Sequence, residues 1–410
     1  MAFNKLTIDD IELKGKRALI RVDFNVPLNA DGEVADDTRL RATLPTVKKV
    51  LDSGGKAVLM SHLGRPKGQK KPEFSLRPVA QSFGKLLGKN VSFVEDCIGE
   101  EAQKAANSLS NGECLLLENL RFYPGETDND SGFAGSLAKL GDIYVNDAFG
   151  SAHRAHASTA GVPSIIKPAV AGYLMMKELD YLGNAIADPK KPFVAILGGA
   201  KISGKIDVIK SLMPKVDRIL VGGGMTYTFF KALGYKIGNS LLEEDRIEMA
   251  ASLIELAKTS ECELILPVDS VIAKDINAGN DEVKTAPDKE IPDGWLGVDI
   301  GPDTLRLFKD KLSDAKTVVW NGPMGIFEKE PFARGTFELA SELANISDKG
   351  AVTIIGGGDS ASAVKKAGVA DRVTHISTGG GASLEFLEGK ELPGVVALTD
   401  KQLEYEVDAR

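Results

Sequence analysis

The residues best suited to bind an anion are arginines and histidines that follow short apolar runs in the first half of the chain. Arginine binds carboxylates and phosphates through a planar, forked guanidinium group. A lone arginine of this kind is usually part of a surface ion pair, but several at one sheet edge would suit a small ligand that carries both groups. These residues, with their neighbours at predicted strand ends and helix starts, are Asp23, Phe24, Asn25, Arg39, Arg41, His62, Leu63, Gly64, Arg65, Arg121, His153, Arg154 and His156.

Glycine clusters mark the second half of the chain. In an open parallel sheet, ligands bind beyond the carboxyl ends of the strands, and glycine there lets backbone N–H groups approach a phosphate. Glycine also serves tight turns, so one cluster carries little weight. Four clusters at corresponding positions favour a nucleotide crevice over packing alone. They are residues 198–199, 222–224, 356–358 and 379–381.

Two motifs in these clusters resemble other nucleotide sites without matching them. Gly199 to Lys205 has the spacing of a Walker A loop, but Ile206 stands where Ser or Thr must hold magnesium. Residues 356–361 match the relaxed dinucleotide fingerprint, yet no carboxylate follows the next predicted strand. The sequence therefore predicts mononucleotide binding.

Three charged residues beside the clusters have two possible interpretations each. Lys201 and Lys205 are either solvated side chains or contacts for an anionic ligand. The second interpretation is favoured because cations are electrostatically unfavourable at the start of a helix. Asp359 either caps a helix over residues 360–366 or holds magnesium together with phosphate oxygens. Glu328, in the loop 320–328, could accept hydrogen bonds from a ribose.

The elements that must position these residues form two similar series. Apolar runs alternate with amphipathic stretches, which is typical of βα units and parallel sheets. Helical spacing over residues 173–187 ends before two prolines, so we place a boundary near residue 188. The sequence predicts an α/β fold with two doubly wound, Rossmann-like parallel-sheet lobes joined by an interdomain helix and hinge. Predicted strands are 17–24, 56–61, 91–94, 113–117 and 143–145, then 192–197, 218–221, 263–267, 317–320, 351–355 and 372–376; predicted helices include 38–51 and 77–87.

Composition narrows the class of protein. The 410 residues are 43% hydrophobic and 26% charged, a globular balance. The net charge of −8 argues against general nucleic-acid binding, and no apolar run is long enough to span a membrane. Residues 1–180 hold 23 basic and 23 acidic side chains, so the excess charge lies in the second half. Three scattered cysteines and a polar N-terminus favour a reduced, cytoplasmic protein.

Together these segments resemble phosphoglycerate kinases. The motifs occur in the family's order along almost the whole chain: RVDFNVP (21–27), SHLGRP (61–66), ENLRF (118–122), NDAFGSAHRAHAS (146–158), GGAKISGKI (198–206), VGGG (221–224), WNGPMGIFE (320–328), GGGDSASAV (356–364) and STGGGASLE (377–385). No residue departs from the family pattern at a position where its function is placed.

The resemblance implies a function for each lobe. Residues 1–172 would bind 3-phosphoglycerate or 1,3-bisphosphoglycerate, 173–188 would form the interdomain helix and hinge, and 189–391 would bind the nucleotide with Mg²⁺. The segment 392–410 would return to the first lobe. Substrate would contact Asp23, Phe24, Asn25, Arg39, His62, Leu63, Gly64, Arg65, Arg121 and Arg154. ADP or ATP would contact Lys201, Lys205, Gly223, Asn321, Glu328, Gly357, Gly358, Asp359 and Ser360.

The resemblance also implies a mechanism. Arg39, Lys205, Gly380 and Gly381 would stabilise the transferring phosphoryl group, with magnesium at Asp359, and hinge closure would bring the ligands together. A cytoplasmic monomer without nucleic-acid or membrane partners is expected. Two alternatives remain at this stage, a Rossmann dehydrogenase and a catalytically silent binding protein with the same fold.

Overall fold

The chain folds into two units in a computed structural model that describes residues 4–287 and 290–401. Unit 1 comprises the described residues up to Asp180 and from Glu391 onward, and unit 2 comprises Tyr181–Lys390. The division falls within helix α7 (Tyr173–Ala187), which has the bounds of the helix predicted there. Part of the predicted terminal segment, residues 402–410, lies outside the described residues.

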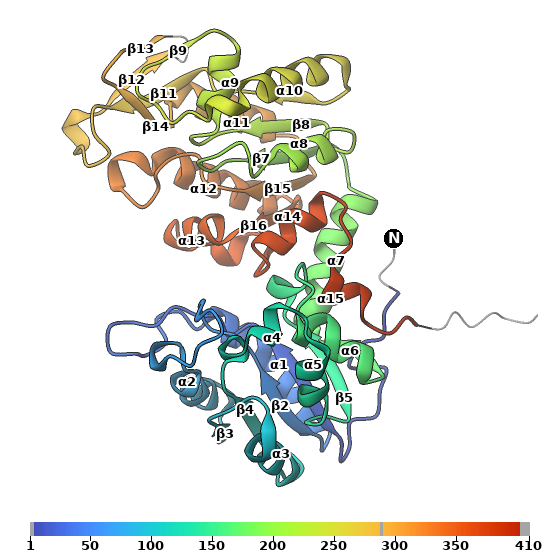
Figure 1. Cartoon of the computed structure of the whole chain (residues 1–410). Coiled ribbons are helices and arrows are strands. Elements are labelled where there is room, and N and C mark those ends of the chain that lie inside the picture. The colour runs from blue at the N-terminus through green and yellow to red at the C-terminus, as the bar shows by residue number, and fades with distance from the viewer. Residues whose placement is uncertain (1–3, 288–289, 402–410) are drawn as a thin grey trace, which may run out of the picture. The chain divides into compact units, whose positions relative to one another are not determined.

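Unit 1 is built on a parallel six-stranded sheet with the order β3-β4-β2-β1-β5-β6. Strands β2, β3, β4 and β5 of this sheet are labelled in Figure 1. The five predicted strands are present, with small differences at their ends, and the sixth, β6, was not predicted. The strands are β1 (Arg17–Val22), β2 (Lys56–Met60), β3 (Val91–Val94), β4 (Cys114–Leu117), β5 (Ile143–Asp147) and β6 (Ala169–Ala171). The helices are α1 (Thr38–Asp52), α2 (Arg77–Leu87), α3 (Gly99–Asn107), α4 (Pro124–Thr127), α5 (Ser131–Ala138), α6 (Val162–Ile165) and α15 (Pro393–Val396).

Strand β1 shows why these runs are almost continuously apolar. It lies inside the sheet and is covered on both faces, so both sets of alternating side chains are buried. Ala18, Ile20 and Val22 join a core formed with α1 and α2. Arg21 alternates with them and is buried elsewhere, beside Ser158.

Unit 2 repeats this architecture with a parallel six-stranded sheet in the order β10-β8-β7-β15-β16-β17. All six of its strands were predicted. They are β7 (Phe193–Leu197), β8 (Arg218–Val221), β10 (Glu263–Ile265), β15 (Thr317–Asn321), β16 (Val352–Gly356) and β17 (His375–Ile376). The helices are α8 (Ile206–Leu212), α9 (Thr226–Ala232), α10 (Ile247–Thr259), α11 (Pro302–Leu312), α12 (Arg334–Asp348), α13 (Gly358–Lys366) and α14 (Gly381–Leu387). The two doubly wound lobes predicted from the sequence are confirmed.

Two small sheets of unit 2 were not predicted. One is antiparallel with the order β12-β11-β14, and the other pairs β9 with β13. Strand β12 has a mostly exposed, polar sequence, which gives no apolar signal. Their strands are β9 (Lys236–Ile237), β11 (Asp269–Ala273), β12 (Lys284–Pro287), β13 (Glu290–Ile291) and β14 (Leu296–Ile300).

The described end of the chain packs on unit 1. The Gly394 N–H donates to the Ala152 carbonyl at 2.8 Å, and Asn146 Nδ2 donates to the Gly394 carbonyl at 3.0 Å. Residues far apart in sequence are thus joined beside β5.

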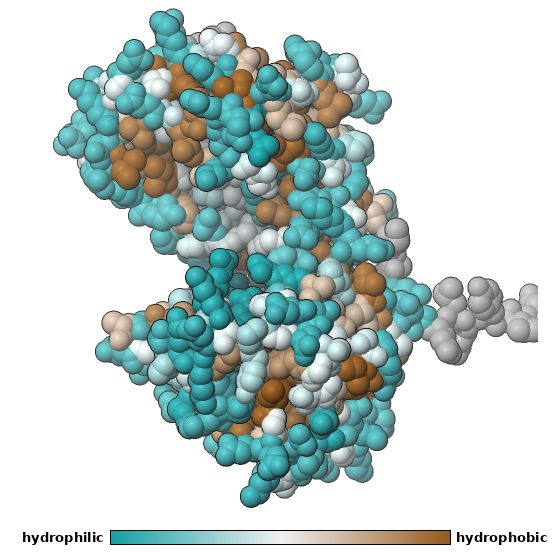
Figure 2. Space-filling model, in the orientation of Figure 1, coloured by the Kyte–Doolittle hydropathy of each residue, from teal (hydrophilic) through white to brown (hydrophobic). Residues whose placement is uncertain are grey.

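The visible surface is mostly hydrophilic, with hydrophobic residues in separate patches (Figure 2). Ile165 and Val396 in unit 1, and Leu241 and Val268 in unit 2, are among the large apolar side chains that are about half exposed. Over the described residues, no helix has the length and apolar character needed to cross a membrane.

Candidate active site

The predicted nucleotide residues of unit 2 gather where β7 and β15 lie side by side. The chain reverses its direction of strand addition between these two strands, which is where open α/β sheets bind ligands. Leu197 and Asn321, at the two strand ends, are in register, and the Gly198 N–H donates to the Asn321 carbonyl at 2.9 Å. The loops that follow the two strands therefore meet at this edge.

Lys205 enters this edge from the start of α8. Its ammonium group donates a hydrogen bond to Asn321 Oδ1. Burial lowers the pKa of Lys205 to about 8, while the nearby Asp359 carboxylate opposes that shift. Lys205 is therefore a partly desolvated cation rather than a solvated surface lysine. Lys201 is exposed.

The glycines at this edge divide into two groups. Gly223 has a φ of +70°, and a Cβ there would lie 2.6 Å from the Gly199 backbone, so close packing of the loops requires this glycine. Gly357 has a φ of +88° and lies against the Asn321 side chain. In contrast, a Cβ at Gly358 or Gly380 would meet no atom within 4 Å. Packing explains the first group, and open space beside the backbone remains at the second.

The start of helix α13 shows that one prediction for Asp359, its role as an N-cap, is wrong. The helix begins at Gly358 with Gly357 as its N-cap and without a side-chain cap, so Asp359 is not the cap predicted for a helix over 360–366. Asp359 is exposed in the first turn, where a negative charge is favourable. Ser360 is buried, and its Oγ accepts a hydrogen bond from the Gly322 N–H at 2.7 Å. Ser360 thus fixes the loop after β15.

The remaining predicted residues of this edge are Glu328, Gly380 and Gly381. Glu328 is exposed at the end of the loop after β15. Gly380 is the N-cap of α14, with a φ of +46°, and Gly381 is its first residue. In the described part of the chain, no three His, Cys, Asp or Glu side chains form a metal-binding group. A magnesium ion at Asp359 would therefore take its other ligands from phosphate oxygens and water, as this ion commonly does.

In unit 1, the first predicted residues form a connected hydrogen-bond network. Arg39 Nη1 donates to both carboxylate oxygens of Asp23, at 3.0 and 2.9 Å, and to the Asn25 carbonyl at 3.1 Å. Asn25 Oδ1 accepts from the Gly64 N–H at 2.9 Å. Arg121 Nη1 donates to the Gly64 carbonyl at 2.9 Å. The ends of β1 and β2, the start of α1 and the segment after β4 are thereby held together.

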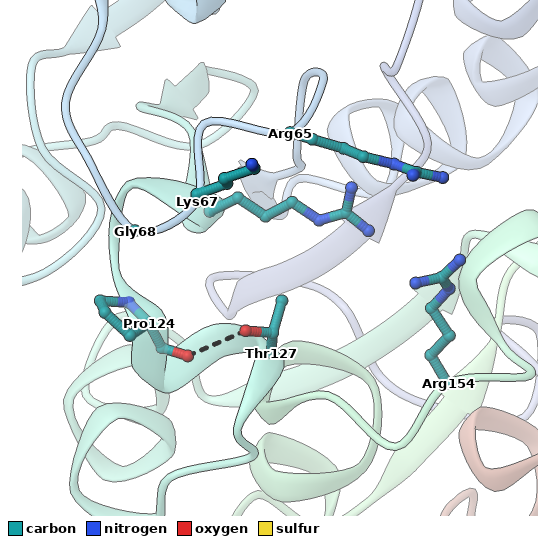
Figure 3. A pocket seen from close by; sticks show the side chains of 7 residues that line it. Arg65, Lys67, Gly68, Pro124, Thr127 and Arg154 are labelled. Atoms are coloured by element: carbon teal, nitrogen blue, oxygen red, sulfur yellow. Dashed lines mark hydrogen bonds between the residues drawn. The ribbon is translucent and has the colours of Figure 1, made fainter.

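A cavity of about 530 Å³ adjoins this network and is strongly basic (Figure 3). Arg65, Arg121 and Arg154 line it, together with Lys67 and Thr127. Burial lowers the pKa of Arg121 to about 10, and the charges of Arg21 and Arg154 act in the same direction. An anion in this cavity would relieve the repulsion among these cations.

Both buried histidines beside the cavity are held neutral. Burial lowers the pKa of His62 well below its usual value, and Arg21, Arg121 and Arg39 lower it further. The pKa of His156 falls to about 4 for the same reasons. In the loop before His156, by contrast, His153 is partly exposed and Arg154 is exposed.

Two predicted substrate residues contribute core side chains instead. Phe24 is fully buried, and its ring lies 4.9 Å from that of Phe83. Leu63 is also buried. Their side chains belong to the core of unit 1, and only their backbone is suited to contact a ligand. Conversely, Arg21 and Lys67 were not predicted as site residues, although both are cationic residues within quoted or adjoining motif segments.

Comparison with known proteins decides the family. The model of the phosphoglycerate kinase family matches residues 8–390. The chain belongs to the phosphoglycerate kinase family.

Relatives match along nearly the entire chain. A phosphoglycerate kinase of Chlorobaculum tepidum is 57% identical over 396 residues, which cover 97% of this chain and 100% of the relative. The cytosolic phosphoglycerate kinase of Triticum aestivum is 56% identical over 394 residues, which cover 96% of this chain and 98% of that protein.

Solved structures give the same result. Phosphoglycerate kinase from Coxiella burnetii superposes with a TM-score of 0.85 at 39% identity, covering 96% of this chain and 98% of that one. The Pyrococcus horikoshii enzyme has a TM-score of 0.83 at 31% identity, with the same coverage of both chains. As a member of this family, the chain is a phosphotransferase that acts on small molecules, which excludes the dehydrogenase alternative.

Proposed function

We propose that the chain catalyses reversible, Mg²⁺-dependent phosphoryl transfer between 1,3-bisphosphoglycerate and ADP, which gives 3-phosphoglycerate and ATP in glycolysis and gluconeogenesis. The observation that carries this proposal is the division of the cationic sites between the units. Arg65, Arg121 and Arg154 surround one cavity in unit 1, and Lys205 lies at the ligand-binding edge of unit 2.

In this proposal unit 1 binds the phosphoglycerate. The three arginines of the cavity bind its phosphate, because their forked donors match phosphate oxygens. Arg39 is held by Asp23 in the hydrogen-bond network that adjoins the cavity, and it faces the carboxyl end of the ligand. Asn25, His62 and the backbone at Gly64 complete the substrate contacts.

Unit 2 binds the nucleotide. Backbone groups at Gly223, Gly357 and Gly358 lie against its phosphates, and Glu328 accepts hydrogen bonds from its ribose. Asn321 and Ser360 fix the loops around it. Asp359 would hold Mg²⁺, which would supply positive charge to the phosphate oxygens.

No general base is required for the transfer. The attacking groups, the ADP β-phosphate and the 3-phosphoglycerate carboxylate, are both ionised at pH 7. Catalysis then consists of positioning and of stabilising negative charge on the transferring group. Lys205 and Arg39 supply the positive charge that stabilises this group, and backbone N–H groups at Gly380 and Gly381 add hydrogen bonds.

Binding measurements on single variants test the division of the ligands. Calorimetry should show that Arg121→Met weakens 3-phosphoglycerate binding and leaves Mg-ADP binding unchanged. Asp359→Asn should have the opposite pattern. Loss of nucleotide binding in Arg121→Met, with 3-phosphoglycerate binding retained, would refute the assignment.

Because the ligands bind to different units, we propose that movement about α7 brings them together for transfer and excludes water. Small-angle scattering should then show compaction when both ligands are present. Unchanged scattering with both sites occupied would contradict this part of the proposal.

We further propose a cytoplasmic monomer. Cys97, Cys114 and Cys262 are buried and unpaired, as expected in a reducing compartment. Relatives differ in location, since that of Triticum aestivum is named cytosolic and that of Volvox carteri chloroplastic. Light scattering after size-exclusion chromatography tests the monomer, and cell fractionation tests the location.

A further inference from the structure

Arg21 is a fully buried arginine that contacts His62, one of the proposed substrate residues. Its Nε donates to Ser158 Oγ at 2.8 Å, and its Nη1 donates to the Val22 carbonyl. Its Nη2 is 3.0 Å from His62 Nδ1 and 3.4 Å from Ser151 Oγ. All three guanidinium nitrogens therefore have acceptors, which fixes the plane of the group.

A buried carboxylate compensates the charge of Arg21 through one serine. Ser158 Oγ accepts from Arg21, so its own proton is free to be donated, and Glu126 Oε1 accepts it at 2.6 Å. Glu126 Oε2 also accepts from the Ser158 N–H at 3.0 Å. Glu126 is fully buried and sits on α4, next to the basic cavity. This network holds the Arg21 guanidinium group in place.

The contact with Arg21 determines where His62 carries its proton. A guanidinium group can only donate, so His62 Nδ1 must present its lone pair. In a doubly protonated ring, Nδ1 carries a proton and cannot accept this hydrogen bond. The ring is therefore neutral, with its single proton on Nε2. The surrounding cations, Arg21, Arg121 and Arg39, together with His156, also disfavour a charged His62.

The other ring nitrogen is directed outward. Within the described residues, the His62 ring hydrogen-bonds to Arg21 through Nδ1, whereas Nε2 has no protein partner. Nε2 is also not one of the fully buried polar atoms without a partner. Nε2 therefore retains access to solvent, although His62 as a whole is only 5% exposed. A small ligand bound beside Arg39 and Arg121 would meet this atom.

We infer that Arg21 is a positioning residue that fixes His62 as a neutral Nε2–H hydrogen-bond donor to the anionic substrate. The identity of that substrate rests on the proposed function, but the tautomer does not. His62 then adds a directed, uncharged donor to a site whose other side chains are mostly cations. Its contribution to binding is constant over the range in which an ordinary histidine titrates.

The first experiment determines the tautomer of the free protein by long-range ¹H–¹⁵N NMR after ¹⁵N-histidine labelling. The chain has only 4 histidines, and loss of one signal set in His62→Gln assigns His62. We expect a protonated Nε2 and an unprotonated Nδ1 from pH 5.5 to pH 8, without titration. A proton on Nδ1, or protonation of both nitrogens near pH 6.5, would overturn the inference whatever the enzyme's activity.

The second experiment tests the role of Arg21. The double variant Arg21→Met with Glu126→Gln removes the donor without leaving a buried carboxylate uncompensated. We expect a mixture of His62 tautomers and a KM for 3-phosphoglycerate that rises about tenfold. Arg17→Met is the control, because Arg17 lies on the same strand but pairs with Asp142. Retention of the pure Nε2–H tautomer in a folded double variant would show that Arg21 does not set it.

A pair of His62 variants tests the donor even if Arg21 cannot be replaced. The amide nitrogen of glutamine can reach the position of Nε2, whereas that of asparagine reaches only the position of Nδ1. His62→Asn should therefore weaken 3-phosphoglycerate binding about tenfold more than His62→Gln. Equal affinities in the two variants would contradict the inference. A shift of the His62 Nε2 signal on addition of 3-phosphoglycerate, absent with inorganic chloride at equal ionic strength, is also expected.

Discussion

Arg39 Nη1 lies 3.0 and 2.9 Å from the two carboxylate oxygens of Asp23. This ion pair joins the start of α1 to the end of β1. The Asp23 side chain is 5% exposed and that of Arg39 is 34% exposed, so the carboxylate is anchored while the arginine still faces solvent. Such pairing pre-organises a cation before the substrate arrives, which lowers the cost of ordering it during transfer.

Replacing Arg39 should therefore affect turnover more than nucleotide binding. We expect Arg39→Met to lower kcat about 100-fold, which is the scale seen when one charge-stabilising donor is lost. Arg41→Met is the matched control, since Arg41 is on the same helix, exposed, and paired with Asp37. Steady-state kinetics and Mg-ADP calorimetry provide the comparison. Intact turnover with altered nucleotide affinity alone would show that the assignment is wrong.

The pKa of Lys205 predicts how nucleotide affinity depends on pH. Because burial lowers the pKa of Lys205 to about 8, this side chain loses its charge as the pH rises through 8. If the charged form binds the nucleotide, the Kd for Mg-ADP should rise about tenfold between pH 7 and pH 9. In Lys205→Met the Kd should be higher and nearly constant over this range. An equal pH dependence in both proteins would exclude Lys205 as its source.

Gly358 separates a ligand requirement from a packing requirement. A Cβ at this position meets no protein atom within 4 Å, so Gly358→Ala should leave the free energy of unfolding unchanged or raise it by about 0.5–1 kcal/mol. Nucleotide affinity should nevertheless fall, because the added methyl group occupies space beside the phosphates. Calorimetry and urea unfolding measure the two quantities.

Gly135→Ala provides the control for that substitution. Gly135 lies in α5 of unit 1 and also has open space around its Cα. This variant should keep normal nucleotide affinity. Unchanged affinity in Gly358→Ala as well would mean that the nucleotide does not approach α13.

The buried carboxyl group of Asp147 should make the free energy of unfolding depend on pH. Burial raises its pKa to about 7, although Oδ1 accepts from the Leu174 N–H at 2.9 Å, at the start of α7. Between pH 3.8 and pH 7 the folded state thus binds the proton more tightly than the unfolded state does. This group's contribution to stability is therefore lost as the pH rises through that window.

Asp147→Asn keeps an oxygen for α7 and cannot ionise. Relative to the parent protein, it should gain about 3 kcal/mol between pH 5 and pH 8, measured by urea unfolding. Asp142→Asn is the control, because hydrogen bonding to Arg17 lowers the pKa of Asp142 and its effect falls below this range. A constant difference between Asp147→Asn and the parent protein from pH 5 to pH 8 would refute the titration of Asp147.

The sequence was sufficient to predict the two parallel sheets because most of their strands are short apolar runs, and the central strands, such as β1 and β7, are buried on both faces. Strand β6 was missed because its three residues, Ala169 to Ala171, are too few to show a pattern. Strand β12 was missed for the opposite reason, since its side chains are mostly polar and exposed. Local periodicity cannot reveal a strand whose stability comes from pairing with distant residues.

The candidate site could be predicted where a residue's chemistry is unusual at its position. Lys205 at a helix start was recognised by that conflict. Phe24 and Leu63 were included through their motif neighbours, whereas their side chains belong to the core. Arg21 was overlooked because its contacts with His62 and Ser158 join residues 41 and 137 positions away along the chain. Such contacts depend on the tertiary fold and leave no local signal.

The most direct test of the proposed activity is a coupled assay with purified protein, ATP, Mg²⁺ and 3-phosphoglycerate, with Lys205→Ala assayed in parallel. We predict turnover that requires all three components and falls by at least about 100-fold in the variant. No turnover in the parent protein, with both ligands shown to bind by calorimetry, would contradict the account and indicate a binding protein that has kept the fold of a kinase.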